Sequence, residues 1–120
     1  MTRLYVPATL RLLAKLDAGL TLPVSDDVVI APDDSEDAEY EALMTAAGAS
    51  AVLAGELDPG ERRRVVIVAE TSDLAASIGL PDVVAVHADS GDLPPDADPD
   101  DLEDLGWYAT QEIPDLLGLN

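Results

Sequence analysis

The 120-residue sequence lacks cysteine and phenylalanine, and it contains one tryptophan, three tyrosines and one histidine. Without cysteine there is no disulfide framework, no thiolate nucleophile and no cysteine-based zinc site. With so few aromatic side chains, the core has to be built from alanine, valine and leucine, which requires close approach of the elements. The length fits one domain, and we expect residues 1–120 to form it.

Positive charge is scarce as well. Six lysines and arginines stand against 25 acidic residues, which gives a net charge of −19. All six lie within residues 1–64, so residues 65–120 carry no lysine or arginine. A chain of this charge repels nucleic-acid phosphates and anionic lipid. We therefore expect neither nucleic acid nor membrane as a partner. The acidity is interpreted as solubility, with salt adaptation or a basic partner as alternatives.

Signals for export, membrane insertion and nucleotide binding are missing too. The apolar stretch after Arg3 is short and is broken at Pro7, which does not fit a signal peptide. No run approaches the ~20 apolar residues of a membrane span. The glycine-rich patterns GxGxxG and GxxxxGK[ST] are both absent. These absences favour a cytoplasmic protein and weaken the case for a nucleotide-binding enzyme.

Strand and helix patterns alternate along the chain. The expected strands are residues 4–6, 28–31, 62–70 and 83–88. The expected helices are residues 10–18, 35–54 and 99–116, with one further helical turn at 73–77. This order predicts an α/β fold, a layered domain with a sheet of about four strands, mixed or mostly parallel, and three main helices. The alternative is an α+β arrangement in which the last two strands are antiparallel.

Local signals place the ends and faces of these helices. Thr9 is the expected cap of the first helix and Gly19 its stop. The side chains expected to face inward from the second helix are Tyr40, Leu43, Met44, Ala47 and Ala51. Those expected from the last helix are Leu102, Leu105, Ala109, Ile113 and Leu116. Pro114 is expected to kink or end that helix.

An acidic linker is expected at residues 89–98. The wider segment 89–104 holds eight acidic residues and three prolines, which is typical of a solvated loop. Residues 96–100 begin like a calcium loop, but Asp101 stands where the loop needs glycine and Trp107 where it needs glutamate. We therefore predict no metal site and no cofactor.

His87 is the candidate catalytic residue, because it is the only histidine and general acid–base catalysis most often uses one. It lies near the end of an expected strand, where open α/β sheets place their ligands. Glu112 and Asp89 are the candidate carboxylate partners. A structural role for a lone histidine is the competing interpretation, so an enzyme is left open and disfavoured.

Two groups of residues are candidates for ligand binding. Arg62 and Arg64 share one face of the expected strand and could hold an anion such as phosphate or carboxylate. On the last expected helix, Trp107 and Gln111 are four positions apart, as are Tyr108 and Glu112. These side chains either lock the helix onto the sheet or line a site with His87 and Tyr5.

The sequence resembles an uncharacterised family of small actinobacterial proteins, a domain of unknown function. Three segments carry the resemblance: RLYVPATLRLLAKL at 3–16; EYEAL at 39–43 with RRRVVIVAE at 62–70; and VVAVHAD at 83–89 with WYATQEIPDLL at 107–117. The resemblance implies a cytoplasmic bacterial protein and no known activity or cofactor. The positions that match its pattern are Tyr5, Pro7, Glu39, Tyr40, His87, Trp107, Tyr108, Gln111 and Glu112.

Three hypotheses for function follow. The first is a non-enzymatic module that binds a protein partner or a small ligand in a bacterial cytoplasm. The second is a small enzyme in which His87 works with Glu112 or Asp89. The third is an acidic mimic of nucleic acid built on residues 89–104. The sequence specifies neither the partner nor the oligomeric state.

Overall fold

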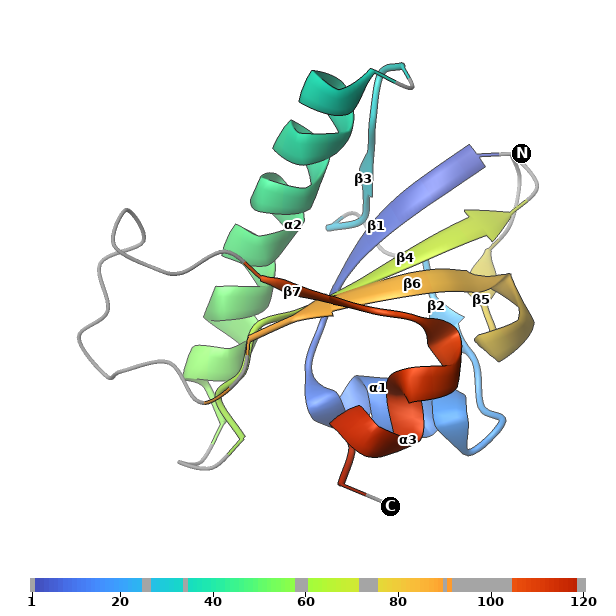
Figure 1. Cartoon of the computed structure of the whole chain (residues 1–120), viewed down its shortest axis with the longest axis vertical. Coiled ribbons are helices and arrows are strands. Elements are labelled where there is room, and N and C mark those ends of the chain that lie inside the picture. Colours follow the sequence, from blue (N-terminus) through green and yellow to red (C-terminus); the bar gives the residue numbers. More distant parts are fainter. Residues whose placement is uncertain are drawn as a thin grey trace.

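A five-stranded sheet forms the centre of the chain's computed structural model (Figure 1). The structure describes residues 2–24, 27–33, 35–57, 61–71, 76–89, 91 and 105–118. The strands are β1 (Thr2–Ala8), β2 (Leu22–Pro23), β3 (Val29–Ile30), β4 (Val65–Thr71), β5 (Ser77–Ile78), β6 (Val83–Ala88) and β7 (Gly106–Tyr108). The helices are α1 (Leu10–Asp17), α2 (Glu36–Gly55) and α3 (Ile113–Leu116), with the 3-10 helices η1 (Leu80–Asp82) and η3 (Thr110–Glu112).

The sheet has the strand order β3-β1-β4-β6-β7, and β2 pairs with β5 in a separate two-stranded sheet. Every strand pair among the described residues is antiparallel. The chain therefore has an α+β fold, and the predicted layered α/β domain with a mixed or mostly parallel sheet is wrong. The alternative named the α+β class, but it made only the last two strands antiparallel.

The connection from β3 through α2 to β4 explains why the alternation of strands and helices led to the wrong prediction of a mixed or mostly parallel sheet. Both β3 and β4 run antiparallel to β1, so they are parallel to each other, as the two strands of a crossover should be. However, β1 lies between them. The crossover is thus a split β-α-β unit, and alternation along the sequence does not reveal the inserted strand.

Two apolar layers flank the sheet. On one face lie α1, α3 and the β2–β5 pair, and on the other lies α2 (Figure 1). Strand β4 is buried on both faces, as its unbroken apolar run predicts. Val65 and Ile67 join the cluster under α1 and α3, whereas Val66 and Val68 join the cluster under α2.

The first helix begins and ends where the sequence predicts. The hydroxyl oxygen of Thr9 accepts a hydrogen bond from the Leu12 N–H at 3.3 Å and so caps α1. Gly19 follows the helix with a φ of +90°, a left-handed conformation that other residues adopt only at a cost. The cap and the stop expected from local signals therefore mark the two ends of this helix.

Strand β1 continues through Pro7 to Ala8, although it was predicted to end at Pro7. β3 pairs only with Leu4 and Tyr5. Beyond Tyr5, β1 has β4 on one side and no β3 residue on the other. A proline is tolerated on such an open side, because no ladder hydrogen bond is lost there.

The long helix α2 packs on the sheet with a row of small side chains. Its buried residues are Ala38, Ala42, Ala46, Ala47, Ser50 and Ala54. Of the side chains predicted to face inward, only Ala47 is buried, and Tyr40 is exposed. The prediction of the inner face is therefore correct for Ala47 and for Leu43, which packs against the cluster under α2, and wrong for Tyr40. Small side chains let the helix approach the sheet closely, which fills the space that a core poor in aromatics would otherwise leave.

Substitution of Gly48 by alanine tests whether α2 packs on the sheet in this orientation. A Cβ added at Gly48 would meet nothing within 4 Å, and the residue is exposed. Gly48→Ala is therefore expected to raise the free energy of unfolding by about 0.5–1 kcal/mol, because alanine loses less backbone entropy in a helix. Urea denaturation followed by circular dichroism measures the change.

Gly19→Ala is the matched control for that experiment. The same substitution at a φ of +90° is expected to lower the free energy of unfolding by about 1–2 kcal/mol. Destabilisation by Gly48→Ala would contradict the described orientation of α2.

The described part of the C-terminal segment, residues 105–118, forms a strand and short helical turns, whereas the sequence predicted a helix at 99–116. Within residues 105–118, which the structure describes, 106–108 pair with β6 as β7, and the helical residues are those of η3 and α3. Pro114 lies in the first turn of α3, where its missing N–H leaves no hydrogen bond unmade, so it neither kinks nor ends a helix. The start of the predicted helix, most of the linker at 89–98 and residues 73–75 of the predicted turn at 73–77 lie outside the described residues, whereas Ser77 lies in β5.

Candidate functional site

The register of the sheet assembles a row of side chains on the face that carries α2. Tyr5 on β1 pairs with Val68 on β4, and Val68 pairs with Ala85 on β6. All three belong to the cluster under α2. Two residues further along β6, His87 pairs with Trp107 on β7. Because side chains alternate between the faces of a strand, His87 lies on the same face as Ala85.

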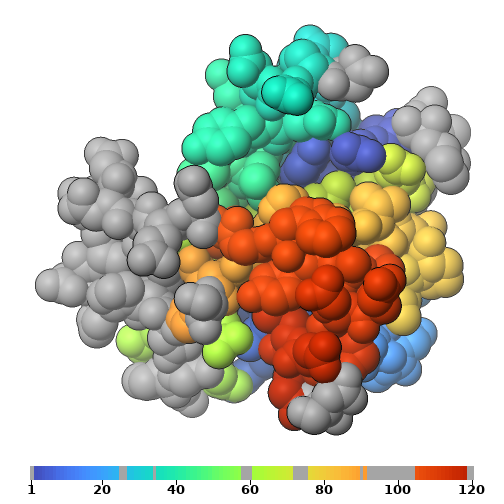
Figure 2. Space-filling model, viewed as in Figure 1, coloured from blue at the N-terminus to red at the C-terminus, as the bar shows by residue number. Residues whose placement is uncertain are grey.

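A groove opens on this face beside α2, which packs mainly on β1, β4 and β3. Its volume is about 360 Å³. We call it the α2–β7 groove. The described residues that line it are Arg3, Tyr5, Glu39, Tyr40, Leu43, Val68, Val84, Ala85, His87 and Trp107. Figure 2 shows this face, with atoms of β1 visible between α2 and the C-terminal segment that contains β7.

A bulge in β6 adds Val84 to the groove. The register changes from Val68 paired with Ala85 to Ala69 paired with Val83, so Val84 has no partner on β4. A bulge inserts one residue and re-aims its side chain. Here the extra residue is an exposed apolar one on the floor of the groove.

Aromatic side chains are concentrated in the groove. The chain has four large aromatic residues, and Tyr5, Tyr40 and Trp107 all line the groove. Tyr5 is buried in the floor, whereas Tyr40 on α2 is 56% exposed and Trp107 on β7 is 60% exposed. Two ring faces are therefore available to a molecule that enters between α2 and β7.

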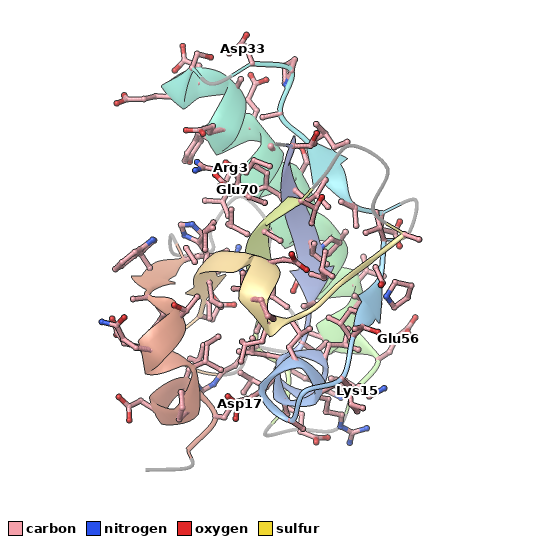
Figure 3. The ribbon with its side chains drawn as sticks, turned by 90° about the vertical axis from the view of Figure 1, so that its right-hand side faces the viewer. Arg3, Lys15, Asp17, Asp33, Glu56 and Glu70 are labelled. Carbon is pink, nitrogen blue, oxygen red and sulfur yellow. The ribbon has the colours of Figure 1, made fainter. Side chains whose placement is uncertain are left out.

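Arg3 connects the groove to two carboxylates. Its guanidinium donates to the Glu39 carboxylate and to the Glu70 carboxylate, each at 2.8 Å. Figure 3 shows Arg3 and Glu70 side by side. The hydrogen bond to Glu70 raises the pKa of Arg3 above its usual value. Burial, with a smaller contribution from Glu39, raises the pKa of the Tyr5 hydroxyl. Both side chains therefore keep their protons at neutral pH.

His87 presents a neutral imidazole to the groove. The side chain is half-buried, and burial lowers the pKa of His87 below its usual value of 6.5. No hydrogen bond or ion pair joins it to another described residue. Its ring nitrogens can therefore serve as a hydrogen-bond donor and an acceptor for a ligand group.

Strand alternation separates Trp107 from the other C-terminal candidates. Trp107 faces the groove, whereas Tyr108 packs against the cluster under α1 and α3 on the opposite face. Glu112 accepts a long hydrogen bond of 3.4 Å from the Ala109 N–H, and Gln111 is exposed. The structure thus brings Trp107, His87 and Tyr5 together and leaves Tyr108, Gln111 and Glu112 elsewhere.

The two arginines proposed to hold an anion lie before β4 rather than in it. Arg62 donates to the Leu57 carbonyl at 2.7 Å. Arg64 is buried, and its guanidinium donates to both carboxylate oxygens of Asp89, at 2.7 and 2.9 Å. Neither arginine is among the described residues that line the groove.

The catalytic pair expected around His87 has its carboxylates engaged elsewhere. Asp89 is held by Arg64, and Glu112 is held by the Ala109 N–H. Glu39 is the one carboxylate among the described groove residues, and it pairs with Arg3. Within the described ranges, no group of three or more histidine, aspartate or glutamate side chains could hold a metal ion.

Sequence reasoning did not place Arg3, Tyr40 and Val84 in the site. Tyr40 was predicted to face inward, and Val84 enters the groove only because of the bulge. The position of the Arg3 side chain depends on Glu70, its partner on β4, and on Glu39 of α2. No local pattern in the sequence predicts the contacts that bring these three residues to the groove.

The comparison with protein families shows which family the chain belongs to. A family model matches residues 2–117. The chain belongs to DUF6912, a family of unknown function. No curated protein and no solved structure matches this DUF6912 chain. Five positions that match the resemblance noted above meet in the groove: Tyr5, Glu39, Tyr40, His87 and Trp107. In the part of this DUF6912 chain that the structure describes, no helix combines the length and apolarity needed to cross a membrane.

Proposed function

We propose that the chain is a non-enzymatic protein-interaction module and that the α2–β7 groove is its binding site. The observation that carries this proposal is the gathering of three of the four large aromatic side chains in one open groove. Two of them, Tyr40 and Trp107, are more than half exposed. Tryptophan and tyrosine dominate binding energy at interfaces, because each buries a large apolar surface with few rotatable bonds.

The engagement of the carboxylates supports binding over catalysis. A general acid or base has to lie within hydrogen-bond reach of the group that it serves, directly or through one water. Asp89 and Glu39 are each held by an arginine, and neither Asp89 nor Glu112 is among the described residues that line the groove. A groove with a neutral imidazole and exposed aromatic rings is suited to recognition.

We place this module in the cytoplasm of an actinobacterium. Support comes from the sequence, which has no cysteine. The motif WYATQEI at 107–113 resembles the actinobacterial family described above. A small molecule in the same groove is the competing occupant.

Site-specific photo-cross-linking in the native host tests the proposal. p-Benzoylphenylalanine in place of Val84 puts the reactive ketone in the groove. In place of Val52 it occupies an exposed position of α2 outside the groove. We expect a discrete protein adduct from position 84 and none from position 52. Trp107→Ala should reduce the yield at position 84 about tenfold or more, the loss typical of an aromatic hot spot.

Three results would count against a protein-interaction module. They are no protein adduct from position 84, the same adduct from both positions, and a yield that Trp107→Ala leaves unchanged in a folded protein. Mass spectrometry of the position-84 variant identifies the competing case, in which the groove carries only a small-molecule adduct.

A further inference from the structure

The electric field over the α2–β7 groove comes from carboxylates. The first turn of α2 holds Glu36, Asp37 and Glu39, and α2 contains no lysine or arginine. Strands β6 and β7 belong to residues 65–120, which contain none either. Both sides of the groove are therefore short of positive charge, in a chain whose net charge is −19. Such a field attracts cations and repels anions over several ångströms.

The one guanidinium in the groove is already neutralised. Arg3 is the only lysine or arginine among the described lining residues. It bridges Glu39 and Glu70, so these three side chains carry one positive and two negative charges. An anionic ligand would have to displace these carboxylates from Arg3, whereas a cationic ligand meets an excess of negative charge.

The aromatic rings of the groove are suited to a cation as well. A guanidinium or ammonium group over the face of a tryptophan or tyrosine is attracted by the negative charge density of the ring, most strongly for tryptophan. Trp107 and Tyr40 both expose their rings at the groove. His87 is neutral at pH 7, because burial lowers its pKa, so it adds no positive charge next to Trp107.

We propose that the occupant of the α2–β7 groove is a lysine or arginine side chain of the partner protein. Its methylene groups lie over Val84 and Ala85, and its charged head contacts the rings of Trp107 and Tyr40 on the side of Glu39. This inference rests on the proposed function, because it names the chemistry of the partner at the same site. It requires a partner with a basic exposed segment.

A second copy of this chain is not the partner that this surface fits. Two chains with a net charge of −19 repel each other, and an isologous contact would oppose the acidic α2 of one copy to that of the other. A basic partner instead gains attraction from the whole charge of the chain, which accelerates association and makes it depend on salt concentration.

Short peptides that differ in one side chain test the inference on the full chain. The probes are acetyl-Gly-Ser-Xaa-Ser-Gly-amide with Xaa as arginine, lysine, citrulline or leucine. Citrulline keeps the shape of arginine and removes its charge. Because Trp107 is the only tryptophan, its single indole cross-peak in a ¹H–¹⁵N spectrum reports the groove directly. We expect the arginine and lysine peptides to shift this cross-peak, with arginine binding about tenfold more tightly than citrulline.

Substitutions in the groove separate local recognition from general attraction to an acidic protein. Glu39→Gln is expected to weaken binding of the arginine peptide about two- to fivefold. Glu41→Gln is the matched control, because it removes the same charge from an exposed position of α2 outside the groove. Tyr40→Leu is expected to weaken arginine binding and leave citrulline binding unchanged. Since Tyr40 is exposed, this variant is expected to fold.

Several outcomes of these experiments would contradict the proposed cationic occupant. Equal affinity for arginine and citrulline, or equal effects of Glu39→Gln and Glu41→Gln, would overturn the inference. So would shifts spread over the acidic surface with no preference for the indole of Trp107. Binding of the leucine peptide alone, with a cross-link from position 84, would refute the cationic occupant and leave the interaction site standing. No peptide binding and no cross-link would remove both.

Discussion

Asp89→Ala is expected to lower the free energy of unfolding by about 3–5 kcal/mol, the cost of removing one partner of a buried ion pair. The Asp89 carboxylate accepts hydrogen bonds from the Arg64 guanidinium at 2.7 and 2.9 Å and from the Arg64 backbone N–H at 3.0 Å. The Arg64 side chain is only 4% exposed. The substitution removes the carboxylate that accepts these three hydrogen bonds and balances the charge of a buried guanidinium. A domain of this size is stable by roughly 5–15 kcal/mol, so the variant is expected to be near its unfolding limit.

Urea denaturation followed by the fluorescence of Trp107 measures this loss. Glu61→Ala is the control, because the Arg11–Glu61 pair has a similar N–O distance of 2.6 Å but lies at the surface. Its loss is expected to be about 0–1 kcal/mol. Equal effects of the two substitutions would show that the Arg64–Asp89 pair is not buried as described. In a second comparison, Arg64→Met combined with Asp89→Ala is expected to be more stable than Asp89→Ala alone, because the buried charge is gone.

Ser50→Ala is expected to lower the free energy of unfolding by about 2–3 kcal/mol, although alanine is the better helix former. The Ser50 hydroxyl donates to the Ala8 carbonyl and accepts from the Val65 N–H, each at 2.7 Å. The side chain is fully buried between α2 and the sheet. Its removal leaves a backbone donor and a backbone acceptor without a partner in an apolar layer. Each such group costs about 1–3 kcal/mol.

Two measurements check this expectation. Urea denaturation gives the stability, and hydrogen exchange of the Val65 amide gives the local effect, because that N–H loses its acceptor. Thr45→Ala is the matched control, since Thr45 is exposed on the same helix. It is expected to be neutral or slightly stabilising. A Ser50→Ala protein as stable as Thr45→Ala, with unchanged exchange at Val65, would contradict the described contact.

The parts of the fold that were predictable from the sequence are those that local chemistry defines. The Thr9 cap and the apolar runs of β4 and β6 are confirmed. The direction and order of the strands depend on pairing between distant segments, and β7 is too short to give a periodic signal. Trp107 was therefore assigned to a helix, although it lies in a strand.

The candidate site was predictable only in part, because hydrophobicity did not identify the residues on the inner face of α2. Hydrophobicity ranks tyrosine and leucine above alanine as core residues, so Tyr40 was expected inside. The sheet instead requires small side chains at the contact, which leaves Tyr40 outside and available to the groove. One of the two sequence interpretations grouped Trp107 with His87 and Tyr5, and these three residues all line the groove.

The placement of β1 between β3 and β4 has a consequence for how the chain folds as it leaves the ribosome. β1 is made early, but its main partner is β4, and their ladder pairs Thr2 with Thr71. Contacts between segments so far apart in sequence form slowly, because a long loop must close before they form. The hydrogen-bonding edge of β1 that pairs with β4 therefore stays open until β4 has emerged. An unpaired strand edge can pair with another chain, and the strong negative charge of this chain opposes such association.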